Sequence, residues 1–77
     1  MTHYYFHCTS ETQAVVDRRG SQLEDLSDAR ARAFAIIQSM VTSTGSEDWR
    51  DWMVHVSDDE GEEILSVPFA SVVGRLH

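Results

Sequence analysis

Two segments of alternating polar and apolar residues, one near each end of the chain, constrain what this sequence can fold into. The first is His3–Thr9, where aromatic residues are dense, and the second runs from Trp52 to Phe69. A period of two in a segment rich in aromatic and β-branched residues is typical of half-buried β-strands. The 77 residues are therefore predicted to form a single domain, 1–77, whose sheet is built from both ends of the sequence.

Between these segments, the sequence predicts a short second strand and one helix. Ala14–Asp17 is apolar enough for a strand, and it ends before Gly20, which tolerates the positive φ angle of a turn. A helix begins at Asp25 or Ser27, either of which can accept a backbone N–H at the N-cap. Its apolar residues recur every three or four positions, at Leu26, Ala29, Ala33, Ile36, Ile37 and Met40. This amphipathic pattern ends around residues 42–44.

The C-terminal segment is predicted to be a β-hairpin. A third strand covers Trp52–Ser57, and a fourth covers Glu63–Phe69. The acidic run Asp58–Gly61 between them ends in a glycine, which is typical of a hairpin turn. Pro68 lacks an N–H group, so the fourth strand is expected to end there or to lie at a sheet edge. Residues 70–76 carry a weak helical pattern.

The order ββαββ predicts an α+β fold, in which a mostly antiparallel four-stranded sheet carries one amphipathic helix on one face. The side chains expected beneath the helix are Tyr4, Phe6, Cys8, Val54, Val56, Leu65 and Val67. The opposite face would then present His3, Tyr5, His7, Met53, His55 and Ile64. Such a face is unusually aromatic and apolar for a surface exposed to water, which indicates an association surface.

Charge argues against nucleic acid as a partner, and the distribution of apolar residues argues against a membrane. The chain has 13 acidic and 6 basic residues, a net charge of −7 and no lysine. Clustered cations bind a phosphate backbone, and here only Arg18 and Arg19 are adjacent. No apolar run approaches the roughly 18 residues that cross a bilayer. The lone cysteine, Cys8, has no intrachain partner for a disulfide, so we expect a cytoplasmic protein in which Cys8 is a small buried apolar residue.

Three histidines are candidate metal ligands, namely His3, His7 and His55. The spacing of His3 and His7 on a strand separates their backbones by about 13 Å, so the two cannot bind one ion directly. His55 can approach either of them across a strand pair, where opposed Cβ atoms lie about 5 Å apart. The simpler interpretation is that all three are polar residues on the surface of the sheet, and no metal or other cofactor is assigned.

The sequence contains no recognisable catalytic motif. Alternation places the side chains of His7 and Cys8 on opposite faces, which excludes a simple dyad. The acidic run Asp58–Glu63 lacks ligands at alternate positions before its glycine, unlike a calcium-binding loop. No phosphate-binding loop, nucleotide-binding glycine pattern, nucleophile elbow or CxxC pair is present. We therefore expect a protein that is not an enzyme, with no catalytic residues.

Several segments together resemble a family of small uncharacterised bacterial proteins. These segments are Tyr4–His7, Leu23–Leu26, Ala29–Ala33, Val54–Gly61 and Val67–Phe69. The resemblance is to a domain of unknown function found largely in soil and plant-associated alphaproteobacteria, and it covers nearly the whole chain. The chain departs from the family at Thr9–Gln13, where members often have an acidic loop that contains glycine. The resemblance implies no activity and no catalytic residues.

The leading functional expectation is an interaction module that associates through its open sheet face or an edge strand, as a homodimer or with another protein. The expected interaction surface consists of Tyr5, His7, Trp49, Met53, His55 and Ile64. Trp49 is equally consistent with capping the helix end and with facing a partner, whereas Trp52 is expected in the core. Two alternatives remain: a metal-binding or metal-sensing domain that uses the open-face histidines, and an antitoxin-like or acidic nucleic-acid-mimic partner of a basic protein.

Overall fold

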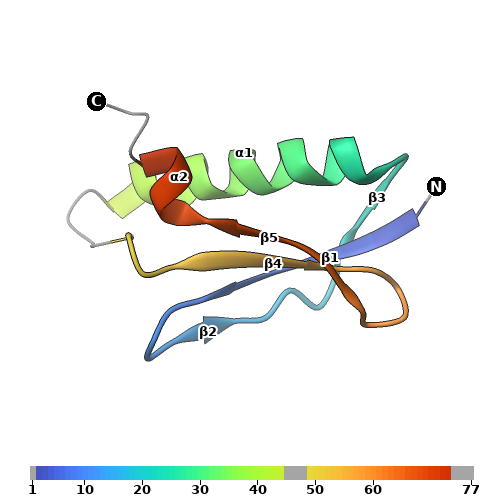
Figure 1. Cartoon of the computed structure of the whole chain (residues 1–77), viewed down its shortest axis with the longest axis horizontal. Helices are drawn as coiled ribbons and strands as arrows, with labels where there is room; N and C mark the ends of the chain where they lie inside the picture. The colour runs from blue at the N-terminus through green and yellow to red at the C-terminus, as the bar shows by residue number, and fades with distance from the viewer. Residues whose placement is uncertain (1, 45–48, 74–77) are drawn as a thin grey trace.

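The computed structural model describes residues 2–44 and 49–73. Its elements are β1 (Thr2–Thr9), β2 (Ala14–Val15), β3 (Ser21–Leu23), α1 (Leu26–Thr44), β4 (Met53–Ser57), β5 (Glu63–Pro68) and α2 (Phe69–Val73). All strand pairs are antiparallel. Helix α1 lies across one face of the sheet, and no described element covers the other face (Figure 1). The predicted α+β fold, an antiparallel sheet with one main helix on one face, is confirmed.

Strand β1 pairs with three other strands. The sheet has the order β2-β1-β4-β5, and β3 also pairs with β1. Because β2 and β3 are short, they share one side of β1: β2 lies opposite Cys8 and Thr9, and β3 opposite Thr2–Tyr4. The sequence predicted four strands. The structure adds β3 and shortens the predicted strand Ala14–Asp17 to Ala14–Val15.

The core lies between α1 and the sheet. The strands contribute alternate residues that are buried, namely Tyr4, Phe6, Cys8, Val54, Val56 and Val67. Helix α1 contributes Ala29, Ala33 and Ile37, which recur every four residues along one side and are fully buried. Two small residues in this row let the helix approach the sheet closely. Leu65 packs against the core but is only partly buried, and Leu26 at the start of α1 is exposed.

An aromatic cluster covers one end of the core, next to the start of β4 and the end of β5. The Trp49 ring stacks on Phe69 with 5.6 Å between centroids and meets Trp52 at 5.2 Å. Trp52, as expected, is buried. The structure places Trp49 in the core, 9 % exposed, and not on the interaction surface suggested by the sequence. The reason is its neighbour Phe69, which begins α2 and provides a flat apolar partner that the sequence pattern did not reveal.

Local hydrogen bonds set the start of α1 and the turn of the hairpin. Asp25 is the N-cap, because its Oδ1 accepts the Asp28 N–H at 2.9 Å. In the hairpin, Asp58 Oδ1 accepts the N–H groups of Glu60 and Glu62, and Gly61 takes φ +86°. Neither described helix is long and apolar enough to cross a membrane.

A bulge between β4 and β5 changes which face two residues occupy. Val56 lies opposite Leu65, whereas Ser57 lies opposite Glu63, so Ile64 is the extra residue on β5. Ile64 packs against the core and therefore does not lie free on the open face, as simple alternation predicted. The same shift places Glu63 beside His55. A regular period of two cannot reveal such an insertion.

The outer edge of β5 offers few backbone groups to another strand. Phe69 N–H donates to Trp52 O at 2.9 Å, so the alternating antiparallel pattern turns Ser66 and Pro68 outward. Pro68 has no N–H, and its carbonyl already accepts the Ser71 hydroxyl at 2.8 Å. The prediction that Pro68 marks a sheet edge is confirmed. Ser66 keeps both an outward N–H and an outward C=O.

Candidate functional site: the open face of the sheet

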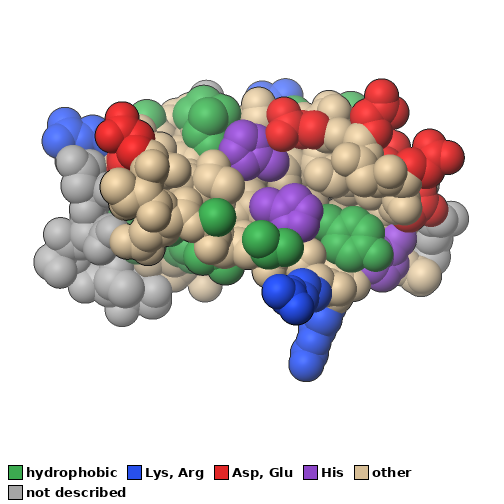
Figure 2. All heavy atoms as spheres, turned by 90° about the horizontal axis from the view of Figure 1, so that it is seen from below, with side chains coloured by type: hydrophobic (Ala, Val, Ile, Leu, Met, Phe, Trp, Pro, Cys, Tyr) green, Lys and Arg blue, Asp and Glu red, His purple; other side chains and the backbone are tan. Residues whose placement is uncertain are grey.

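The face of the sheet opposite α1 carries the residues singled out from the sequence. We call it the open face and define it by His3, Tyr5, His7, Thr9, Met53, His55, Ser57 and Glu63. Register brings these residues together in pairs: Tyr5 lies opposite Ser57, His7 opposite His55, and Thr9 opposite Met53. Figure 2 views this face directly, and histidine and hydrophobic side chains occupy its middle. All eight residues except Glu63 are partly buried even without a covering element.

The side chains of β1 form a row of rings along the open face. His3 and Tyr5 have ring centroids 4.9 Å apart, and Tyr5 and His7 are nearly parallel, 4° between planes, at 6.4 Å. Residues at i and i+2 on a strand share a face, which is why three consecutive odd positions line up. The row gives the open face three adjacent rings, of which Tyr5 and His7 are parallel and His3 is tilted by 53° to Tyr5.

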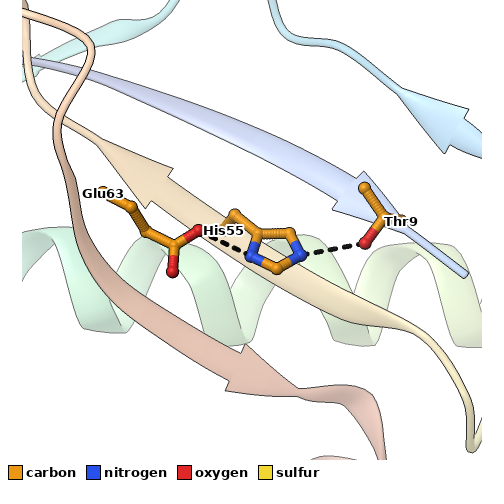
Figure 3. A network of polar contacts seen from close by, with 3 residues as sticks. All are labelled: Thr9, His55 and Glu63. Carbon is orange, nitrogen blue, oxygen red and sulfur yellow. Dashed lines mark hydrogen bonds and ion pairs between the residues drawn. The ribbon is translucent and has the colours of Figure 1, made fainter.

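His55 is held from both sides by neighbouring strands. Its Nδ1 lies 2.8 Å from Glu63 Oε1, and its Nε2 lies 2.9 Å from Thr9 Oγ1 (Figure 3). Because a carboxylate only accepts, Nδ1 carries a proton and donates it to Glu63. In the neutral imidazole Nε2 accepts the Thr9 hydroxyl proton. In the charged imidazolium Nε2–H donates to the Thr9 oxygen instead, so both protonation states keep two hydrogen bonds.

Asp17 fills the gap that β2 and β3 leave along β1. Its Oδ2 accepts the Phe6 N–H at 3.1 Å, while its Oδ1 accepts the N–H groups of Arg19 and Gly20 at 3.1 and 3.0 Å. Desolvation by burial raises the pKa of the Asp17 carboxyl, but these three bonds and the nearby His7 outweigh it and lower the pKa overall. A side chain thus completes the edge of the sheet where no strand does.

The loop between β2 and β3, which contains Asp17, also holds two of the histidines by hydrogen bonds. The Asp17 N–H donates to His7 Nδ1 at 3.0 Å, so neutral His7 carries its proton on Nε2. His3 Nε2–H donates to the Arg19 carbonyl at 2.6 Å. Sequence reasoning did not identify the roles of Asp17, Thr9 or Glu63. The loop conformation brings Asp17 to its partners, the bulge brings Glu63 to His55, and the register of β1 on β4 brings Thr9 to His55.

The predicted approach of His55 to another histidine is confirmed for His7, which is its register partner on β1. A metal site needs more than this pair. Across residues 2–44 and 49–73, no group of three or more His, Cys, Asp and Glu side chains is placed to hold a metal ion. His3 lies four residues from His7 along β1 and is tied to the Arg19 carbonyl.

The order carboxylate, imidazole, hydroxyl in Glu63, His55 and Thr9 is that of a relay that activates a nucleophile. Such a relay also needs a hollow that holds a substrate beside the hydroxyl. Two hollows lie elsewhere: one of about 310 Å³ beside Ile36 and Met40 on α1, and one of about 330 Å³ between α1 and β5. None of the three relay residues lines either of them. The three side chains link β1, β4 and β5, and thus form a polar brace across three strands.

Comparisons with known proteins place the chain in a family and no further. Neither the curated proteins nor the solved structures include one that matches it. Residues 3–70, which run from the start of the aromatic row to the first turn of α2, match one family of domains across almost the whole fold. The chain belongs to the family described as a domain of unknown function, DUF6894.

Proposed function

We propose that this protein is a non-enzymatic module that forms a homodimer by packing the open faces of two sheets against each other. The observation that carries the proposal is the open face itself. It presents a row of rings with Met53 beside it, and no described element covers it. Sheets that pack face to face lie about 10 Å apart and interdigitate side chains of this size.

The edges of the sheet support face packing over strand addition. Along β5, Pro68 has no N–H, and its carbonyl already accepts the Ser71 hydroxyl. Along β1, the two short strands and the Asp17 carboxylate occupy the backbone groups. Short, interrupted edges of this kind discourage pairing with another chain. Of the two routes of association expected from the sequence, the structure therefore favours the face.

Four ring nitrogens of the open face already have hydrogen-bond partners within the protein. Both ring nitrogens of His55 have partners, as do Nδ1 of His7 and Nε2 of His3. A buried polar group is costly mainly when it has no hydrogen-bond partner. Covering these four nitrogens would thus add little desolvation cost to the burial of the apolar ring surface. This internal satisfaction favours an apolar partner surface, which a second copy of the same face provides.

The size of the molecule sets a demand on the interface. A standard interface buries about 800 Å² on each partner. With Cα extents of 35 × 25 × 18 Å, the protein meets this value only if most of one face is covered. We therefore expect the rings near the centre of the open face to dominate the affinity, with a dissociation constant in the micromolar range or below.

Sedimentation velocity between about 1 and 100 μM tests the proposal. The wild-type chain should sediment as a dimer at the upper concentrations, and Tyr5→Glu should sediment as a monomer, because its charge would be buried in the interface. Gln38→Glu adds the same charge on the exposed side of α1 and should leave the dimer intact. Circular dichroism and tryptophan fluorescence confirm that each variant is folded. A wild-type chain that is monomeric at 100 μM overturns the proposal.

A further inference from the structure

Opposite charges gather at two opposite edges of the open face. Arg18 and Arg19 are exposed in the loop between β2 and β3, on the outer side of β1. Glu60 and Glu62 are exposed in the turn before β5, at the other side of the sheet. Figure 2 shows basic side chains projecting from the lower edge of this face and acidic side chains along the upper edge at the right. We call the two arginines the basic pole and the two glutamates the acidic pole.

The four side chains of the poles have no internal role, in contrast to three acidic side chains near the open face. Asp58 holds the turn, Glu63 holds His55, and Asp17 holds the β1 edge. Within the described residues, no hydrogen bond or ion pair engages the side chains of Arg18, Arg19, Glu60 or Glu62. Their charges are available to a partner. In a chain of net charge −7, a basic pole beside an apolar face is a specific feature, because like-charged copies otherwise repel each other.

Two-fold symmetry connects these observations. In a dimer whose axis lies in the plane of the interface, a feature at one edge of a face meets the opposite edge of the partner face. If the axis runs along the row of rings, which lies between the two poles, the basic pole of each copy meets the acidic pole of the other. The dimer then has two such contacts. The rings near the axis then meet their own equivalents. A rotation that superposed like poles would place arginines on arginines and glutamates on glutamates.

We propose that the two poles select this arrangement, so that the partner of the open face is specifically a second copy of the same chain, oriented by Arg18 and Arg19 against Glu60 and Glu62. This inference rests on the proposed face-to-face dimer and adds to it the orientation and the source of specificity. Charges at the rim of an interface contribute mainly to orientation and partner choice, and the apolar centre supplies affinity.

Paired charge reversals test the orientation. One variant, Arg18→Glu with Arg19→Glu, has two acidic poles, and the other, Glu60→Arg with Glu62→Arg, has two basic poles. Each variant alone should dimerise at least about tenfold more weakly than wild type, because like charges then face each other at both contacts. Mixed in equal amounts, the two should form a heterodimer within about threefold of the wild-type affinity, since opposite charges are restored at both contacts. The mixed pair also carries the same total charge as two wild-type chains.

Fluorescence anisotropy or analytical ultracentrifugation with one variant labelled provides the measurement. The control is Arg30→Glu with Arg32→Glu, which changes net charge as the first variant does but lies on α1, on the other side of the sheet. By itself it should dimerise with nearly wild-type affinity, and mixed with the basic variant it should form no heterodimer as tight as that of the two charge-reversal variants. Raising the salt concentration should reduce the difference in affinity between mixed and unmixed samples, because the Debye screening length falls to about 3 Å at 1 M.

The outcomes separate the two proposals. If the wild-type chain dimerises and Tyr5→Glu does not, but mixing the two charge-reversal variants restores no affinity, the open face is the interface and the orientation by the poles is wrong. If the wild-type chain does not dimerise at all, the face-to-face dimer itself is wrong. If charge reversal at the poles leaves the affinity of each variant unchanged, the poles lie outside the interface and the inference is overturned.

Discussion

Removing the Asp17 carboxylate should destabilise the fold far more than removing an ordinary surface carboxylate. In the native state this group accepts three backbone N–H groups, from Phe6, Arg19 and Gly20. In Asp17→Ala, the Phe6 N–H loses its partner at a partly buried position in β1, and the turn that leads into β3 loses its two anchors. An ordinary exposed carboxylate such as Glu24 has no such role, and its replacement by alanine is the matched control.

The expected loss follows from these bonds. A hydrogen bond to a charged group contributes about 1.5–3 kcal/mol. The bonds from Phe6 and Gly20 are partly buried, whereas the N–H of Arg19 is exposed and can bond to water in the variant. Counting two bonds near the lower value, because the carboxylate is itself partly exposed, gives about 2–4 kcal/mol. A domain of this size has roughly 4–11 kcal/mol of stability in total, so the loss would be a large fraction of it.

Urea unfolding followed by tryptophan fluorescence measures this loss, because Trp49 and Trp52 both lie in the core. Asp17→Ala should lower the free energy of unfolding by about 2–4 kcal/mol, and Glu24→Ala by less than about 0.5 kcal/mol. Asp17→Asn keeps one acceptor oxygen and should fall between them. Equal stabilities for Asp17→Ala and Glu24→Ala would refute the view that the carboxylate completes the edge of β1.

The pH dependence gives an independent check. The folded-state pKa of Asp17 is lowered below its ordinary value of 3.8. A lowered pKa means that the carboxylate stabilises the fold above the unfolded-state pKa, and that this contribution is lost as pH falls through the lower folded-state pKa. The difference in unfolding free energy between wild type and Asp17→Asn should thus be constant near neutral pH and shrink below about pH 4. If this difference in unfolding free energy grows as the pH falls, the carboxylate does not stabilise the fold in its charged form.

Two further predictions concern the same region. Gly20→Ala should lower the free energy of unfolding by about 2 kcal/mol or more, because Gly20 has φ +67° and a Cβ there would lie 2.6 Å from the Tyr4 carbonyl oxygen. Gly61 has φ +86°, but a Cβ there would meet nothing within 4 Å, so Gly61→Ala should lower it by only about 1 kcal/mol. Urea unfolding measures both values. Burial, together with the charge of Asp17, raises the pKa of the Cys8 thiol, so a thiol reagent at neutral pH should react with it at least about a hundredfold more slowly in native buffer than in urea. Similar values for the two glycine variants, or a fast-reacting native thiol, would contradict these expectations.

The sequence predicted the parts of the fold that depend on regular periodicity. Alternation identified β1, β4 and β5 and sorted Tyr4, Phe6, Val54 and Val56 into the core. The spacing of small and apolar residues identified α1. These predictions succeed because period and burial are local properties of each segment.

The remaining features depend on where another segment lies. Strand β3 is only three residues long and exists because the N-terminal end of β1 is available to it. Ile64 faces the core because one extra residue interrupts the ladder, and Trp49 is buried because Phe69 is placed against it. No short pattern in the sequence encodes these three relations, since each is decided by tertiary contacts.

The same limit applies to the candidate site. The prediction that Tyr5, His7, Met53 and His55 share one face follows from alternation, and register adds that His7 and His55 are direct neighbours. The brace formed by Thr9 and Glu63 and the carboxylate of Asp17 could not be predicted, because each involves a side chain that crosses from one strand or loop to another.

The central position of β1 has a consequence for how the chain folds. Thr9 and His55 are in contact although they are 46 positions apart in the sequence. The hairpin of β4 and β5 can close on its own, but the sheet is complete only after β1 pairs with β4, which requires closing a loop that includes the whole helix. We expect the docking of β1 to limit the folding rate. Until that step, the aromatic row of β1 and one edge of the hairpin are both exposed. The high acidic charge would then oppose aggregation of the chain before it is fully folded.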